Sequence, residues 1–377
     1  MKAIFKKLML VSSVALVFMG CNDNMGDTDG RLASVNTLLE PADGKSVVLE
    51  ASASASVYFE WKAASVEEAG TALYQIAFDK ADGDFSKPVY VVSANNNGYN
   101  NFATVTHKLL NQIAGKVGIK PADTGTFKWT VFSTKGMQSM KSSVENKITV
   151  TRLAGFEDVP IDVTGEASEG GADLAKAHKM KAVAGGEFEV YTKLAAGKSF
   201  NFTDGKSGTT RVFYTADGVI KENGTTTVPK DGIYRITLDF NTGACTYTLV
   251  NKIGFYFCPN DEILFELPYV GYGVFQTKAT VNFKEESWGK DERYKFRMFI
   301  QENNGADAEK EVDWGTLNQT DSRPTASSPE TYYYLQMFNE TSQWENKWKL
   351  MGDFDGVPAT YTIYLTADQP YTHTIVK

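Results

Sequence analysis

Three tryptophans in polar surroundings are the residues whose types and spacing best suit ligand chemistry. Each is flanked by charged, amide or glycine residues: Trp288, Trp314 and Trp344. An indole ring that is not used in a core can cover the apolar face of a ligand and bury its area. Arginine, lysine, aspartate or asparagine nearby can bond hydroxyl groups. The three indoles are therefore candidate stacking platforms, and a core position stays the alternative for each.

Further candidates lie between these tryptophans in the sequence. Arg293 and Arg297 alternate with the apolar residues of a segment at 292–299, which gives either a solvated strand face or a hydroxyl-binding one. In the run of three tyrosines at 332–334, alternation directs at least one ring to the opposite face. Tyr332 and Tyr334 are therefore candidates for an exposed ring.

Composition excludes several kinds of chemistry. The chain has 3 His and 3 Cys, widely scattered, so no zinc or iron–sulfur ligand set is expected, and we predict no metal and no cofactor. The formal net charge is −8 without basic blocks, which argues against nucleic-acid binding. No nucleophile elbow or phosphate loop is present, so no catalytic residue is predicted.

The N-terminus reads as a targeting segment. Three lysines precede an apolar run at 8–19 that is too short to span a bilayer, and Gly20 and Cys21 follow the run. This pattern resembles a lipoprotein signal at 1–20 with lipidation at Cys21; simple secretion is the alternative. Residues 21–31 are polar and acidic and predict a flexible tether. The expected location is the outer-membrane surface of a Gram-negative bacterium, with membrane contact through the lipid anchor only.

Period-two alternation and frequent turn signals predict an all-β chain of tandem β-sandwiches. At two places a series of predicted strands ends and a polar connector begins. These places divide the chain into a first unit at 32–153, a second unit at 154–250 and a third unit at 251–377. The aromatic residues are concentrated late, because residues 252–377 hold 23 of the 47. A sandwich core needs only a handful, so we expect some of these rings on a surface of the third unit.

The first unit resembles a known family through several segments in order. They are residues 38–49 (LLEPADGKSVVL), 59–61 (FEW), 74–79 (YQIAFD), 83–88 (GDFSKP) and 127–131 (FKWTV). These segments resemble the N-terminal domain of SusE-type outer-membrane lipoproteins of starch-utilisation-like systems. The resemblance implies an immunoglobulin- or fibronectin-III-like spacer domain.

The other two units are similar to the glycan-binding sandwich modules of SusE/SusF-type proteins. The second unit resembles a carbohydrate-binding module at 186–188, 194–202 and 228–236, and the third matches more loosely at 292–297 and 348–350. The family implies non-catalytic glycan binding at the cell surface, with a TonB-dependent SusC/SusD-like complex as partner. The third unit is the expected binder, and the acidic balance favours a neutral polysaccharide or oligosaccharide.

The sequence is also compatible with two other functions. A structural scaffold or adhesin-type surface lipoprotein would need no glycan affinity. A small glycoside hydrolase needs only two suitably spaced carboxylates, which 46 acidic residues cannot exclude. The state of Cys245 and Cys258, a disulfide or two free thiols, is also open.

Overall fold

A computed structural model describes residues 32–66, 70–153, 159–206 and 210–377. Strands dominate these residues and helices are few and short, which confirms the all-β class with tandem sandwiches. The predicted signal segment 1–20, the tether 21–31 and Cys21 lie outside the described residues. Within the described ranges, no helix has both the length and the apolar character needed to cross a bilayer.

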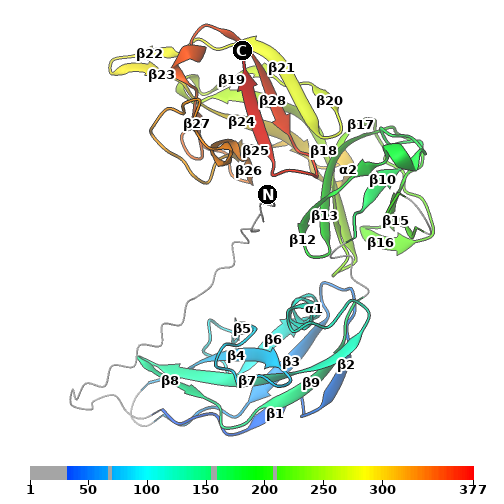
Figure 1. The fold of residues 1–377 in the computed structure, drawn as a ribbon, viewed down its shortest axis with the longest axis vertical. Coiled ribbons are helices and arrows are strands. Elements are labelled where there is room, and N and C mark those ends of the chain that lie inside the picture. The colour runs from blue at the N-terminus through cyan, green and yellow to red at the C-terminus, as the bar shows by residue number, and fades with distance from the viewer. Residues whose placement is uncertain (1–31, 67–69, 154–158, 207–209) are drawn as a thin grey trace, which may run out of the picture.

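The first unit is a sandwich of two sheets (Figure 1). One sheet has the strand order β1-β3-β6 and the other β2-β9-β7-β4-β5, with β8 paired to β7. The chain enters through β1 in one sheet and continues into β2, which runs parallel to β9 in the other. Such a pair of facing sheets is the immunoglobulin-like arrangement that the family resemblance implies. The elements are β1 (Leu38–Glu40), β2 (Lys45–Val48), β3 (Ser56–Trp61), β4 (Leu73–Lys80), β5 (Tyr90–Ser93), β6 (Phe102–Thr106), α1 (His107–Lys116), β7 (Thr124–Lys135), β8 (Gln138–Lys141) and β9 (Asn146–Thr151).

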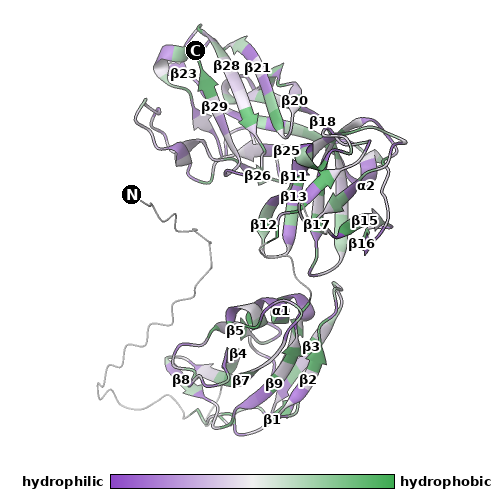
Figure 2. Ribbon diagram, turned by 45° about the vertical axis from the view of Figure 1, so that its right-hand side comes forward, coloured by the Kyte–Doolittle hydropathy of each residue, from purple (hydrophilic) through white to green (hydrophobic). Residues whose placement is uncertain are grey.

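Alternation along these strands places the core. Hydrophilic and hydrophobic bands follow one another along many strands in Figure 2. Trp61 and Trp129 lie fully buried between the two sheets, because each alternates in phase with other apolar residues of its strand. Thr106, just before helix α1, caps the helix because its hydroxyl accepts the N–H of Leu109 at 3.2 Å.

The second unit is a single curled antiparallel sheet around its own core. Its strand order is β11-β10-β14-β15-β16-β18-β17-β13-β12. The Asp217-Gly218 pair, a residue combination typical of tight hairpins, joins β15 to β16, and both residues have the positive φ (55° and 75°) that a two-residue hairpin needs. The elements are β10 (Asp162–Thr164), η1 (Leu174–Lys176), β11 (His178–Lys179), β12 (Lys181–Ala184), β13 (Glu187–Leu194), β14 (Asn201–Thr203), β15 (Val212–Ala216), β16 (Val219–Glu222), β17 (Gly232–Asp239) and β18 (Ala244–Phe257).

The third unit packs two sheets around the largest group of buried aromatic side chains. One sheet contains β19, the second half of β18, β24, β25 and β26, with β27 also paired to β24; the other has the order β20-β21-β28-β29. The elements are η2 (Cys258–Asn260), β19 (Glu262–Glu266), β20 (Tyr269–Gly271), β21 (Val274–Thr280), β22 (Lys284–Glu286), β23 (Gly289–Asp291), β24 (Arg293–Gln301), α2 (Glu302–Gly305), β25 (Lys310–Gly315), η3 (Glu330–Tyr333), β26 (Gln336–Phe338), β27 (Trp348–Lys349), η4 (Gly352–Phe354), β28 (Pro358–Tyr364) and β29 (Thr372–Val376).

Strand β18 belongs to two units at once. Its first half pairs with β17, and from Leu249 onward it pairs with β24, so Val250 has a partner on each side. The predicted boundary between 250 and 251 therefore falls inside a continuous strand. The division into three domains stays a prediction, and the three separate clusters of buried side chains are what supports it.

Both cysteines of the described chain are buried free thiols. Cys245 lies in the core of the second unit and Cys258 follows β18 in the third. Burial raises the pKa of both thiols, that of Cys258 to about 12, so neither is a ready nucleophile.

Candidate functional site

Two exposed tryptophans lie together on the third unit, on either side of one arginine. Trp288 is at the two-residue tip of the β22–β23 hairpin and is 63% exposed, because the tip has no sheet to pack against. Trp344 is 37% exposed and lies in the segment between β26 and β27. The guanidinium carbon of Arg293 is 5.9 Å from the ring centroid of Trp288 and 4.2 Å from that of Trp344. Three predicted site residues from three elements are thus brought together.

Asp291 fixes the arginine between the two rings. Its carboxylate accepts the Nε–H of Arg293 at 2.8 Å and 3.0 Å and is also bonded by the terminal Nη2. Burial would raise the pKa of Asp291, but the hydrogen bonds from Arg293 outweigh burial and lower it. The same bonds raise the pKa of Arg293. The site therefore holds a permanent cation against two aromatic faces, a favourable cation–π geometry.

Buried charges hold the segment that carries Trp344 against the sheet. Lys295 is fully buried, forms an ion pair with Asp313 at 2.9 Å and donates to the carbonyl of Glu345 at 2.7 Å. Asp313 accepts the backbone N–H of Ser342 at 3.0 Å. The hydroxyl of Ser342 in turn accepts the N–H of Trp344 at 3.2 Å. We call Lys295, Arg297 and Asp313 the anchoring triad, because together they fix residues 342–345.

Arg297 does not lie where the predicted hydroxyl-binding role would require it. Its Nε donates to Asp313 at 2.8 Å and its Nη2 to the carbonyl of Ser342 at 3.3 Å. The guanidinium also lies 4.0 Å from the ring centroid of Tyr256, so little of it reaches solvent. The alternating face at 292–299 is not a solvated strand face here, because residues 342–345 cover it. Arg297 acts on the candidate site through Trp344 rather than by direct contact.

Trp314 is a core residue and not a platform. It is 3% exposed, and its ring meets those of Tyr191 and Tyr371 edge-on at 6.1 Å and 5.8 Å. Phe296 is its register partner across β24 and β25, so Trp314 shares the inward face with Phe296 and Val312. The prediction of an exposed ring at Trp314 is corrected for this reason.

The tyrosine run lies apart from the tryptophan pair. Residues 330–333 form a short 3₁₀ helix, so the strand alternation assumed for them does not hold. Tyr332 packs on the core, and its carbonyl accepts the indole N–H of Trp348 at 2.6 Å. Tyr334 is half-buried and lines a separate recess of about 420 Å³ together with His373. Among the ring contacts of the described residues, neither tyrosine touches Trp288 or Trp344.

Two residues near the site were not singled out from the sequence. Tyr256 supports the guanidinium of Arg297, and Gln343 donates to the carbonyl of Cys258 at 2.9 Å, which ties the Trp344 segment to the end of β18. The signal for Tyr256 was present, since it alternates between Phe255 and Phe257, which both face the core. Gln343 had no such signal because it belongs to an irregular segment.

The arrangement suits binding. Two indole faces offer apolar area, and the guanidinium between them keeps N–H groups for a ligand hydroxyl. The buried acids beside the pair, Asp291 and Asp313, are both ion-paired to cations. No three His, Cys, Asp or Glu side chains of the described chain are grouped as metal ligands would be.

Comparison with known proteins assigns the N-terminal part of the chain. Residues 24–132 match the family model described as SusE outer membrane protein. Among solved structures, that of SusF from Bacteroides thetaiotaomicron aligns over 92% of this chain and 77% of its own, with 12% sequence identity and a TM-score of 0.31. No curated protein sequence matches this chain. Over residues 24–132, this chain is similar to the SusE outer membrane protein family.

Proposed function

We propose that this chain is a surface lipoprotein that binds a neutral polysaccharide or oligosaccharide without cleaving it and presents it to a SusC/SusD-like uptake complex. The family match over residues 24–132 supports an outer-membrane setting. Lipidation at Cys21, followed by the acidic tether 21–31, would hold the folded units away from the membrane while leaving them attached.

The observation that carries the proposal is the exposed pair of Trp288 and Trp344 with Arg293 between them. Sugar rings present flat C–H faces bordered by hydroxyl groups, so an indole can cover a face while a guanidinium bonds the edge. A single exposed apolar side chain needs no explanation, but these two indoles lie beside the same arginine, and a group of exposed apolar side chains rimmed by polar residues marks a binding surface. Two rings on separate loops can contact more than one sugar of the same chain.

Charge favours a neutral ligand. Once residues 1–20 are removed, 35 Lys and Arg remain against 46 Asp and Glu, a net charge of −11. Asp291 already neutralises Arg293, so no unpaired cation is offered to a uronate or sulfate at the pair. Uronic-acid and sulfated chains should therefore bind more weakly than neutral ones of equal length.

Affinity electrophoresis and calorimetry with the mature chain test the proposal. The ligands are neutral plant, fungal and bacterial polysaccharides, with pectin and a sulfated glycan as charged comparisons. Retarded migration in at least one neutral glycan supports the proposal. Migration unaffected by every glycan, together with co-purification of a SusC/SusD-like complex, would replace it with a scaffold role. Release of reducing sugar from the same panel would replace it with a hydrolase.

A further inference from the structure

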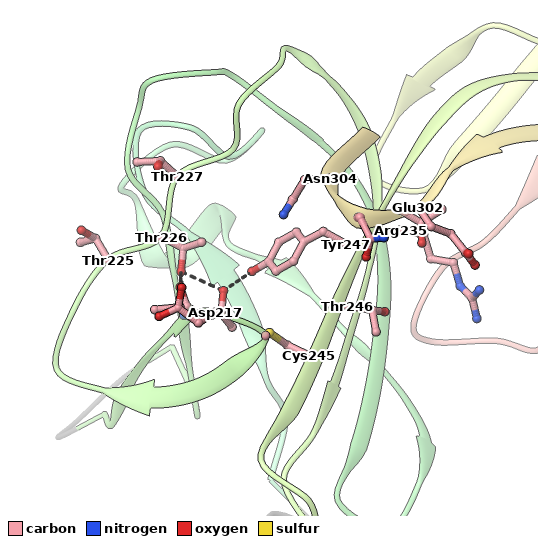
Figure 3. A pocket seen from close by; sticks show the side chains of 15 residues that line it. Asp217, Thr225, Thr226, Thr227, Arg235, Cys245, Thr246, Tyr247, Glu302 and Asn304 are labelled. Atoms are coloured by element: carbon pink, nitrogen blue, oxygen red, sulfur yellow. Dashed lines mark hydrogen bonds between the residues drawn. The ribbon is translucent and has the colours of Figure 1, made fainter. Parts of the chain in front are cut away.

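Aromatic side chains distinguish a recess of the third unit from the larger recess beside the second. The larger one, of about 710 Å³, is lined mainly by hydroxyl, amide and backbone groups (Figure 3). Among the described residues that line it, Tyr247 is the one aromatic, and its hydroxyl is 2.6 Å from that of Thr215. The recess of about 420 Å³ in the third unit has three tyrosines in its lining, Tyr333, Tyr334 and Tyr364. We call it the tyrosine recess.

Strand register makes the tyrosine recess a slot. Tyr364 of β28 is paired with Thr372 of β29, and Tyr334 forms a bridge with Thr372 on the other side of that strand. Residues paired in register point to the same face of a sheet, and neighbouring strands lie about 4.8 Å apart. The backbones of the two tyrosines are therefore about 9–10 Å apart, and the small side chain of Thr372 lies between them. The slot has an aromatic residue on each side and a small residue as its floor.

Contacts behind the slot hold the tyrosine run in place and leave two rings available. Tyr333 meets the ring of His373 edge-on at 5.3 Å, and its carbonyl accepts the hydroxyl of Thr372 at 3.1 Å. These contacts fix the end of the run against β29. The hydroxyls of Tyr334 and Tyr364, by contrast, make no hydrogen bond with any described residue, and both side chains are half-buried. Their rings are therefore free to contact a ligand.

Charge in the tyrosine recess is negative. Glu330 is the ionised residue in its lining, and the Glu330 carboxylate has no hydrogen bond or ion pair with any described residue. His373 lies buried beneath, where burial lowers its pKa to about 3, so its ring is neutral at pH 7. Lys181 of the second unit does not line the recess. Its Nζ donates to the carbonyl of Gln369 at 2.6 Å and lies 4.9 Å from the ring centroid of Tyr371.

Two tyrosine rings and an unpaired carboxylate together favour a positively charged group. The face of an aromatic ring carries the negative part of its quadrupole, and a cation within about 6 Å of the ring centre is attracted to it. The attraction grows where water is partly excluded, as it is between two rings. An anion is repelled by Glu330. A neutral sugar stacks on the same rings but gains nothing from the charge of Glu330.

We propose that the tyrosine recess binds an organic ammonium group, held between Tyr334 and Tyr364 with the carboxylate of Glu330 as its counter-ion. A small free amine and the lysine side chain of a partner protein share this chemistry. The site goes beyond the proposed function, because it lies apart from Trp288 and Trp344 and uses a charge that a neutral glycan does not have.

Titration of the mature chain with two ammonium probes tests the proposal. The probes are choline and a lysine blocked at its α-amine and carboxylate, and binding is followed by saturation-transfer NMR. The probe that binds more tightly identifies the source of the ligand. An uncharged analogue of choline, in which carbon replaces the nitrogen, has the same shape and should bind at least about tenfold more weakly. Affinity for the ammonium probes should also fall as salt is added.

Substitutions separate the contribution of the rings from that of the carboxylate. Tyr364→Leu keeps apolar bulk without an aromatic face, and it should weaken ammonium binding about tenfold while the circular dichroism spectrum stays that of the folded chain. Glu330→Gln, at an exposed position, should weaken it about fivefold and reduce its dependence on salt. Tyr99→Leu changes an exposed ring of the first unit, and Glu340→Gln changes an exposed acid of the third. These two variants are the matched controls and should bind as the wild type does.

Three results would overturn the tyrosine recess as an ammonium site. They are equal binding of choline and its uncharged analogue, binding of neither ammonium probe, and binding of a neutral hexasaccharide that Tyr364→Leu abolishes while choline does not bind. Failure of the proposed function is distinguishable from these results. Choline binding that survives Trp288→Ala and Trp344→Ala combined, and that Tyr364→Leu and Glu330→Gln both weaken, upholds the recess whatever the glycan titrations give.

Discussion

Arg293 sets the geometry of the exposed tryptophan pair, because its guanidinium lies against both rings while Asp291 holds its Nε. A free arginine side chain loses rotamer entropy when it is ordered on a surface. Here folding already orders the side chain of Arg293, because the buried carboxylate of Asp291 bonds it before any ligand binds. The pair is therefore organised in advance, which lowers the cost of binding.

Removing either exposed ring tests the pair directly. Trp288→Ala and Trp344→Ala should each weaken binding of a neutral glycan about tenfold, which corresponds to about 1.4 kcal/mol of lost stacking. The measurement is calorimetric titration with whichever neutral hexasaccharide the wild-type chain binds most tightly. Tyr99→Ala in the first unit removes a ring whose exposure lies between those of the two tryptophans, and it should leave affinity unchanged. Normal affinity in both tryptophan variants would remove the pair from the binding site.

The Asp291 carboxylate makes affinity depend on pH in one direction. The pKa of Asp291 in the folded chain lies below the usual aspartate value. The ionised carboxylate therefore contributes to affinity at any pH above this folded pKa, and the contribution is lost as the pH falls through it. Affinity should therefore stay level from about pH 8 down to the ordinary aspartate value of about 4, and decline only at a lower pH. Asp291→Asn should bind more weakly with no such decline. A decline that persists in Asp291→Asn would place its origin in another acid.

His373 predicts a second pH effect, on stability. It is fully buried, its Nε2 is 2.7 Å from the hydroxyl of Tyr294 and its Nδ1 is 3.0 Å from the carbonyl of Tyr333. Burial lowers its pKa to about 3, so the unfolded chain binds a proton below about pH 6.5 that the folded chain does not. The free energy of unfolding should fall by about 1.4 kcal/mol per pH unit from this residue between about pH 6 and 4.

Urea unfolding at pH 7, 6, 5 and 4 measures this slope for the wild type and for His373→Gln. His178, whose pKa burial lowers to about 4, adds a contribution of the same sign. The variant should therefore lose part of the slope and keep the part that His178 supplies. An unchanged slope in His373→Gln would mean that His373 does not titrate on unfolding.

At the scale of elements, the anchoring triad decides where the Trp344 segment lies. A buried charge left without its partner typically costs 3–5 kcal/mol, whereas an exposed pair contributes less than about 1 kcal/mol. Asp313→Asn should therefore destabilise the third unit by about 3 kcal/mol, raise the solvent exposure of Trp344 and weaken glycan binding. Urea unfolding, iodide quenching of tryptophan fluorescence and calorimetry read out the three effects. Asp353→Asn, which breaks the exposed pair with Lys377, is the matched control and should change none of them.

Alternation predicted the elements well where one face is buried and turn residues mark the ends. The strands around Trp61 and Trp129, and the hairpin at Asp217 and Gly218, follow from the sequence. β18 was expected to end at Val250, because Asn251 and Lys252 look like a polar connector. It continues to Phe257, since β24 supplies a new partner strand that the sequence does not reveal.

Part of the candidate site could also be predicted from whether a residue belongs to an alternating run. Trp288 and Trp344 were recognised because their polar neighbours do not alternate with apolar ones. Trp314 has polar neighbours as well, yet the register of Phe296 with Trp314 turns it inward. Sequence also gave no sign that residues 342–345 would fold over β24, and this cover converts Arg297 from a candidate ligand contact into part of the anchoring triad.

For the whole molecule, the contacts between units differ in kind. The first unit meets the second through polar groups, with Lys108 bonded to Glu187 and Asp239 and Asn111 bonded to Asn241. The second and third share β18, and Tyr191 of the second unit is buried in the core of the third beside Trp314. Polar contacts permit independent unfolding, whereas a shared strand and a shared core couple two units.

We therefore expect residues 159–377 to unfold in one cooperative step, separate from that of the first unit. Tyr191→Ala tests the coupling, because it removes a fully buried ring and should cost about 3–5 kcal/mol. Scanning calorimetry should show the transition of 159–377 moving as a whole while that of the first unit stays in place. Trp129→Ala is the reciprocal control, since it removes a ring from the first core and should move only the first transition. If Tyr191→Ala instead split the transition of 159–377 into two, the second and third units would be independent, and β18 would be a linker between domains rather than a shared strand.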